Sequence, residues 1–207
     1  MSKHLNKKIT CDIIVVSLFR RIAMDNIIDK KKYYLRTFLR WLEAEFFGLF
    51  AFLFYAAFST ALGIAGNIIF GIIGILMLVC VMADFGYKAG AECRNKVKLH
   101  GAPECRSFGN SLGLISMAPS YILLGVLMLS KSGLIMNFLP AYKLLNSCFY
   151  PIISIFTPTA KVADASPALY IMMLFLPLFY FASLSISYKW GYDSVDIKTK
   201  LMYRNKQ

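Results

Sequence analysis

The sequence predicts an all-α integral membrane protein with four transmembrane helices arranged as two helical hairpins. Residues 46–62 and 64–83 contain no charged side chain, and only Gly63 separates them. A helix needs about 20 apolar residues to cross the hydrocarbon core of a bilayer. Most of the 23 Lys and Arg residues lie between or outside such apolar runs. This distribution is typical of membrane proteins that keep their basic loops in the cytoplasm.

Composition favours the same class. The chain has 207 residues, of which 58% are apolar and 16% are charged. Soluble domains have about 45–50% apolar residues and about 25% charged residues. The net charge is +12. Because the basic residues flank apolar runs, we expect the bilayer and its anionic lipid headgroups, and no nucleic acid, as partners.

The N-terminal segment, residues 1–45, is predicted to be cytoplasmic and basic, with ten Lys and Arg. Apolar side chains recur in it at helical spacing: Leu35, Phe38, Leu39, Leu42 and Phe46. This pattern predicts an amphipathic interfacial helix over residues 30–45 that lies on the inner membrane surface. The candidate membrane-surface residues are Lys32, Arg36, Arg40 and Trp41. The alternative is a soluble helix packed on the protein's own loops.

The first hairpin consists of spans 46–62 and 64–83, joined by a very tight turn. Small residues at a spacing of four allow two membrane helices to approach closely. The candidate helix-packing residues are Ala57, Ala61, Gly63, Asn67 and Gly71. Asn67 lies close to the turn and is expected at the interface. Glu43 and Glu45 precede the first span, where they suit the positive end of a helix dipole.

The second hairpin consists of spans 112–129 and 168–186. Pro119 and Pro177 lie inside these spans and predict a kink in each. Ser116 and Ser120 are expected to help satisfy the backbone groups that the first kink frees. Both hairpins end in an aromatic residue, Gly and Tyr, at residues 85–87 and 190–192. This similarity indicates either an internal duplication with both repeats in the same orientation or a chance similarity, since these residue types are common at membrane interfaces.

Residues 134–156 are apolar but contain Lys143, Pro140 and Pro151. A lysine at the centre of a span costs about 2.5–3.5 kcal/mol on insertion scales. We therefore expect two short helices that begin near the two prolines, where proline suits a first helical turn. They are predicted to be interfacial or re-entrant and to lie between spans 3 and 4.

The distribution of Lys and Arg predicts the orientation. Ten lie in residues 1–45, five in 88–111 and five in 188–207, whereas three lie between spans 3 and 4. Four spans put the three basic segments on one side, so both termini are expected in the cytoplasm. The chain is thus predicted to be a multi-pass protein of the cell membrane, with a membrane domain over 46–192 and a basic cytoplasmic tail over 193–207.

No set of residues predicts chemistry. The five cysteines are irregularly spaced, and Cys93, His100 and Cys105 are too few for a structural zinc site. We predict no catalytic, cofactor-binding or metal-binding residue and no enzyme activity. The function expected is that of a non-enzymatic accessory or scaffold subunit of a membrane complex, with a larger membrane-protein partner. The alternative is a small homo-oligomeric transporter or pore, and the third hypothesis is a lipid-modifying membrane enzyme.

Overall fold

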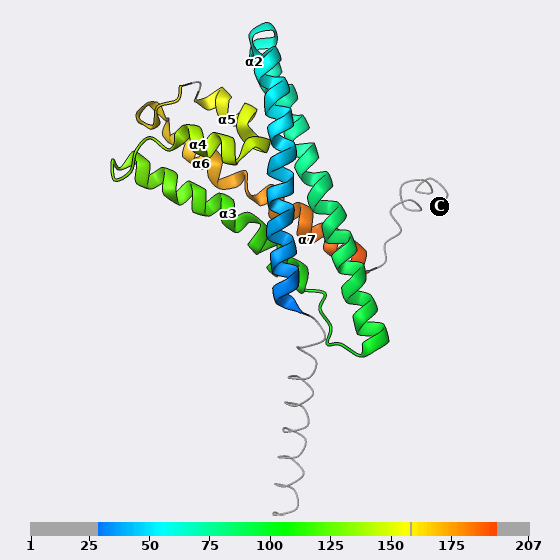
Figure 1. Ribbon diagram of the computed structural model, residues 1–207. Helices are drawn as coiled ribbons and strands as arrows, with labels where there is room; N and C mark the ends of the chain where they lie inside the picture. Colours follow the sequence, from blue (N-terminus) through cyan, green and yellow to red (C-terminus); the bar gives the residue numbers. More distant parts are fainter. Residues whose placement is uncertain (1–28, 158, 194–207) are drawn as a thin grey trace, which may run out of the picture.

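The computed structural model describes residues 29–157 and 159–193 of the chain. The described residues form helices joined by loops and contain no strand (Figure 1). The α-helices are α2 (Lys30–His100), α3 (Phe108–Lys131), α4 (Leu139–Leu145), α5 (Tyr150–Phe156), α6 (Pro167–Phe175) and α7 (Leu178–Tyr192). Two short 3-10 helices are η1 (Ser147–Phe149) and η2 (Val162–Asp164).

Helix α2 folds back on itself at Gly63, and its two arms run side by side (Figure 1). Gly63 has φ 53° and ψ −132°, a conformation that is essentially restricted to glycine. The carboxylate of Asp29 caps the first arm by accepting from the Lys32 N–H at 3.1 Å. Gly101, with φ 62°, ends the second arm. The Tyr33 hydroxyl joins the two arms by donating to Glu92 at 2.9 Å.

Among the described residues, four helical segments are long and apolar enough to cross a membrane: Lys30–Phe58, Ala61–Leu99, Phe108–Lys131 and Pro167–Tyr192. The predictions of an all-helical fold and of four helices that could span a membrane are therefore confirmed for this part of the chain. The fourth segment is broken between α6 and α7 at Pro177, as predicted. Pro119 does not break α3, in which it is an internal residue.

Residues 30–45 differ from the prediction of a separate interfacial helix. They are the first part of α2, and no break separates them from the apolar run that follows. One face of this part is buried in the core, because Tyr33, Thr37, Trp41 and Ala44 recur at helical spacing and face the rest of the protein. Leu35 and its apolar neighbours lie on the opposite face and are exposed.

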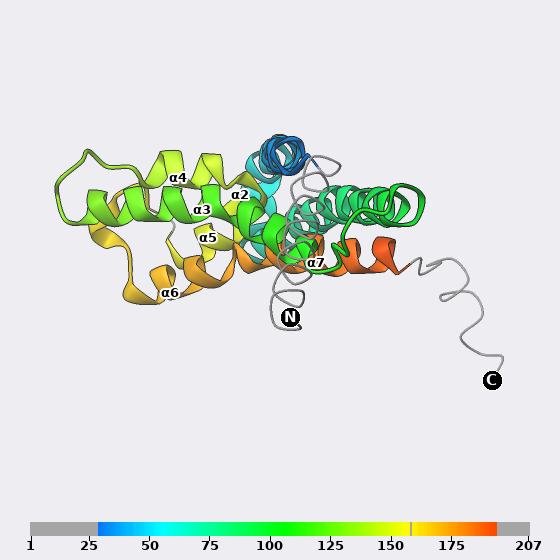
Figure 2. The same ribbon diagram turned by 90° about the horizontal axis from the view of Figure 1, so that it is seen from below.

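Helix α3 extends across the first arm of α2, and α7 packs obliquely along the second arm. Figure 2 shows the first arm nearly end-on, with α3 extending to its left and α7 beside the second arm to its right. The closest approach is between the second arm and α7, at a contact that we name the glycine crossing: Gly86 and Gly90 of α2 with Gly191 of α7. A Cβ at Gly90 would meet the backbone of Tyr188, and one at Gly191 would meet the backbone of Tyr87. The two aromatic-Gly-Tyr segments of the sequence thus pack on each other.

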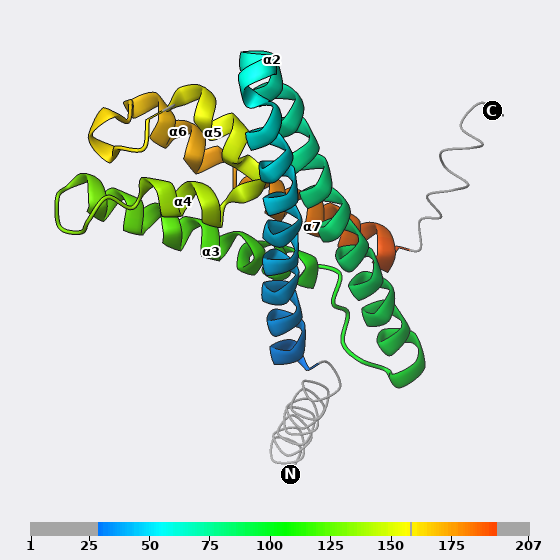
Figure 3. The same cartoon turned by 45° about the horizontal axis from the view of Figure 1, so that its top comes forward.

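The remaining helices form a group on one side of α2. Figures 1 and 3 show α4, α5 and α6 beside α3. α5 also packs on the second arm, where a Cβ at Gly71 would meet Ile152. α3 packs on α7 through Gly109 and Gly113, whose Cβ positions face Tyr188 and Ser185. The core is therefore continuous from the glycine crossing to the α4–α5 pair, where the buried polar residues gather.

Candidate functional site

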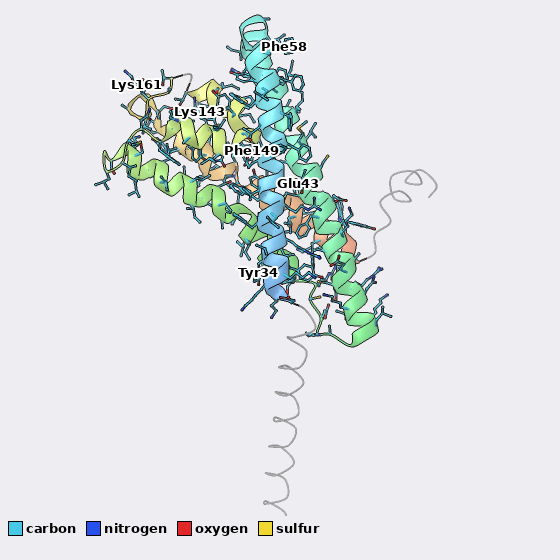
Figure 4. The ribbon with its side chains drawn as sticks, in the orientation of Figure 1. Tyr34, Glu43, Phe58, Lys143, Phe149 and Lys161 are labelled. Carbon is cyan, nitrogen blue, oxygen red and sulfur yellow. The ribbon has the colours of Figure 1, made fainter. Side chains whose placement is uncertain are left out.

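The segment between α4 and α5 docks against both arms of α2. We name residues 146–149 the tip; they contain η1 and connect the two short helices that begin at Pro140 and Pro151 as predicted. A Cβ at Gly48 would lie 2.6 Å from the Cys148 nitrogen, and one at Gly74 would collide with the Cys148 carbonyl. Glycine is thus required at both positions for the tip to reach α2. Figure 4 shows Phe149 of the tip beside the first arm.

Glu45 is the polar centre of this contact. It is 6% exposed, and its carboxylate accepts from the Tyr180 hydroxyl of α7. It also accepts from the Ser147 hydroxyl at 3.0 Å and from the Cys148 N–H at 3.3 Å. Three elements that are distant in sequence therefore meet at one carboxylate. Hydrogen bonds to an ionised group are stronger than neutral ones and are costly to leave unmade in a buried place.

The position of Glu45 corrects the sequence-based expectation. We expected Glu45 at the start of a span, near the positive end of its own helix dipole. α2 begins at Lys30, so Glu45 lies well inside the helix and faces the tip instead. Glu45 instead accepts a hydrogen bond from the N-terminal end of another helix. Its donor is the Cys148 N–H, which lies in the first turn of the helical segment Ser147–Phe156.

Lys143 satisfies the other end of the same segment. Its ammonium group donates to the carbonyl of Thr157 at 2.5 Å and to that of Thr159 at 3.3 Å. Thr157 is the C-cap of α5, so this cation lies at the negative end of the helix dipole. Lys143 is 5% exposed, and Figure 4 shows it on α4, away from α2. The buried carboxyl group of Glu45 and the buried amino group of Lys143 thus satisfy opposite ends of one short helical segment.

A groove opens between the two arms of α2 next to the apolar runs. Its volume is about 480 Å³. The first arm lines it with Arg36, Leu39, Arg40 and Glu43, and the second arm with Phe85, Lys88, Ala89 and Glu92. We name it the arm groove. It combines three cations, two carboxylates and an apolar floor, so it can hold a small amphipathic group that carries charge.

Two thiols meet where the second arm ends. Cys93 and Cys105 are buried next to each other, and the Tyr188 hydroxyl donates to the Cys105 carbonyl at 2.9 Å. The neighbouring Cys93 thiol and, second, burial raise the pKa of the Cys105 thiol. The described residues contain no group of three or more potential metal ligands. His100 is the helix end, and its side chain lies outside the described part of the structure.

The structure does not bring the predicted helix-packing residues together. Ala57 and Ala61 are exposed, and Gly63 forms the turn with open space around its Cα. Gly71 is buried, but a Cβ there would meet Ile152 of α5 and not the first arm. Asn67 is partly buried near the turn, and its Oδ1 has no hydrogen-bond partner among the described atoms. Close packing through glycine occurs instead at the tip and at the glycine crossing.

The predicted membrane-surface residues separate into two groups. Lys32 and Arg36 are exposed, and Arg40 is half-buried beside Glu43. Trp41 contradicts its prediction: it is 6% exposed, packs in the core and stacks on Phe38 at a ring-centroid distance of 5.8 Å. Trp41 lies on the face of α2 that packs against the rest of the protein, so its ring is not available to lipid.

The residues that sequence reasoning missed are Glu45, Gly48 and Gly74. In the first arm, the sequence offers one local indication of their contact with the tip. Glu45 directly precedes the apolar run, and Gly48 follows three residues later. Their partners in the tip and in α7 are about a hundred residues away along the chain. No local pattern joins them.

No protein-family model, no curated protein and no solved structure matches this chain.

Proposed function

We propose that the chain lies in the cell membrane as two helical hairpins, with both termini in the cytoplasm. The three basic segments, which hold 20 of the 23 Lys and Arg residues, support this orientation. α4 and α5 then form a re-entrant element on the outer side. A cysteine at Met136, which is 84% exposed, should react with a membrane-impermeant thiol reagent on intact cells, whereas one at Leu99 should not. Reaction at Leu99 alone would reverse the orientation.

Within the membrane, we propose that the chain is a non-enzymatic accessory subunit that docks on a larger membrane protein. The observation that carries this proposal is an apolar surface on the first arm of α2. We name it the 35–42 face; it consists of Leu35, Phe38, Leu39 and Leu42, which are 61%, 41%, 53% and 43% exposed. The opposite face of the same helix is buried in the protein core.

The position of the 35–42 face favours a protein partner over lipid. α2 continues without a break from Lys30 to the turn, so this face precedes the apolar run that begins at Phe46. At a rise of about 1.5 Å per residue, Leu35 lies about 16 Å from Phe46 along the helix. When the arm crosses the bilayer, this distance places Leu35 outside the hydrocarbon core. Contiguous apolar surface in water usually marks a protein contact.

Photo-crosslinking in the native cells tests the proposal. Benzoylphenylalanine at Leu35 or Leu42 of the full chain should give one discrete adduct with a different, larger membrane protein. The matched control is the same residue at Ile72, which is 53% exposed within the apolar run of the second arm and should give no discrete protein adduct. Adducts with lipid alone at Leu35 and Leu42 would overturn the proposal.

Glu45 favours a second candidate, a small homo-oligomeric transporter or pore. Buried ionisable groups and interrupted helices at membrane depth often mark a substrate path. Glu45 lies beside such an interruption, the tip between α4 and α5. Under this hypothesis the crosslinks at Leu35 and Leu42 join two copies of this chain. The purified chain in liposomes should then release a trapped small solute, and Glu45→Gln should block the release.

A further inference from the structure

The arm groove has a charge pattern that the docking role does not explain. Its cations are Arg36, Arg40 and Lys88, and its carboxylates are Glu43 and Glu92. Arg40 pairs with Glu43 in the next turn of the same helix. The Arg36 guanidinium lies 3.5 Å from Glu92 across the groove. Both pairs are exposed to solvent, and such pairs contribute little to stability, so a ligand can exchange with them at low cost.

Glu92 also accepts from an uncharged donor. The Tyr33 hydroxyl donates to Glu92 at 2.9 Å from the buried face of the first arm. Lys88 pairs with Asp84 at 2.8 Å on the second arm, and its side chain remains 65% exposed. The groove thus offers positive and negative groups side by side, with both signs accessible.

We propose that the arm groove binds the headgroup of a phosphatidylethanolamine-type phospholipid, a phosphodiester that carries a primary ammonium. Its phosphate accepts from the Arg36 and Arg40 guanidinium groups and from Lys88, and its ammonium donates to Glu43 and Glu92. Every charged side chain then keeps a partner of opposite sign. A purely anionic headgroup would take the Arg36 and Arg40 guanidinium groups from Glu92 and Glu43 and supply no cation in their place. A choline headgroup has no N–H to donate.

The location of the groove favours a membrane lipid over a free solute. Glu43 lies three residues before the apolar run of the first arm, and Phe85 lies two residues after that of the second. These spacings correspond to about 5 Å and 3 Å along the helices. The headgroup layer extends about 5–8 Å beyond the hydrocarbon core, so this end of the groove lies within it. Arg36 and Glu92 lie about 15 Å and 14 Å along the helices from the apolar runs, so they form the aqueous end of the groove and meet the outermost part of the headgroup. Phe85 supplies apolar surface for the glycerol and the start of the acyl chains.

Lipid titration of the full chain in neutral detergent tests the proposal. The probes are dioctanoyl phosphatidylethanolamine, dioctanoyl phosphatidylglycerol, dioctanoyl phosphatidylcholine and water-soluble phosphoethanolamine, with binding followed by native mass spectrometry. We expect saturable binding of the first, at least tenfold tighter than binding of the other three. The double variants R36Q/R40Q and E43Q/E92Q should each weaken it at least tenfold.

The matched control is K31Q/K32Q, which removes two cations from the same arm at exposed positions outside the groove and should leave binding unchanged. Should R36Q/R40Q fail to fold, Lys88→Gln tests the same phosphate contact at an exposed side chain. The proposed contact between the lipid ammonium and the carboxylates would be overturned if phosphatidylglycerol bound as tightly as phosphatidylethanolamine. It would also be overturned if E43Q/E92Q left the binding of phosphatidylethanolamine unchanged. If phosphoethanolamine bound as tightly as the lipid, the ligand would be a free solute and not a membrane lipid. Crosslinking at Leu35 and Leu42 is independent of all these outcomes, so the docking proposal can fail separately.

Discussion

The two arms of α2 meet at the turn at Gly63, and small residues near this turn behave differently from those at the glycine crossing. At the glycine crossing, Gly86 and Gly90 bring the backbone of the second arm against the backbone of α7. Near the turn, Ala57 and Ala61 are exposed and meet no other helix. The local composition is similar at both places, but only the glycine crossing meets a second backbone. A small residue therefore permits a contact between membrane helices and does not by itself create one.

The difference between the glycine crossing and the turn follows from the lipid that surrounds the helices. Lipid tails are as apolar as leucine, so two helices gain little from apolar burial and depend on close packing. Where α7 crosses, the missing Cβ atoms at Gly90 and Gly191 allow backbone contact. Near the turn, side chains such as Phe58 and Ile64 face outward, where acyl chains serve as well as a protein would. Stability should therefore be concentrated at the crossing and at the tip.

The largest effect is expected at the glycine crossing. Gly90→Leu places a side chain against the backbone of Tyr188 and should lower the free energy of unfolding by about 3 kcal/mol or more. Thermal unfolding in detergent measures it. Gly125→Leu is the matched control, because Gly125 lies in a helix with nothing within 4 Å of its Cβ position. Equal melting temperatures for the two variants would mean that the crossing does not hold α7 in place.

An intermediate effect is expected at Glu45. Glu45→Gln keeps the size of the side chain but weakens the hydrogen bonds from Tyr180, Ser147 and Cys148, and should cost about 1–3 kcal/mol. Glu43→Gln, two residues away, removes only an exposed pair with Arg40 and should cost less than about 1 kcal/mol. The comparison uses the same thermal unfolding. A melting temperature that falls equally in both variants would indicate that the charge of the arm, and not the contact with the tip, is what matters.

Features encoded by local sequence were predictable. The uncharged runs predicted the apolar helices, Gly63 predicted the turn, and Pro177 predicted the break before α7. Proline at the start of a helix predicted both α4 and α5. Each of these features depends on the length of an apolar run or on the backbone geometry of one residue. None of them depends on a contact with a residue that is distant in the sequence.

The contacts between helices were not predictable in the same way. A helix in lipid is apolar on every side, so periodicity does not reveal which face meets the protein. Gly71 illustrates the problem, because its position was predicted to face the first arm and it faces Ile152 of α5. Glu45 illustrates the same problem for polar residues, since its partners Ser147 and Tyr180 lie 102 and 135 residues further along the chain.

The smallest effect is expected at Ala61, an exposed residue beside the turn of α2. Ala61→Leu adds a large apolar side chain at a position where no other helix approaches, so acyl chains can accommodate it. The free energy of unfolding should change by less than about 0.5 kcal/mol, as at surface positions generally. Gly71→Leu, on the second arm, meets Ile152 and should clearly lower the melting temperature in the same detergent. A loss of stability in Ala61→Leu comparable to that in Gly71→Leu would show that a further helix, such as one from a second copy of the chain, covers the turn of α2.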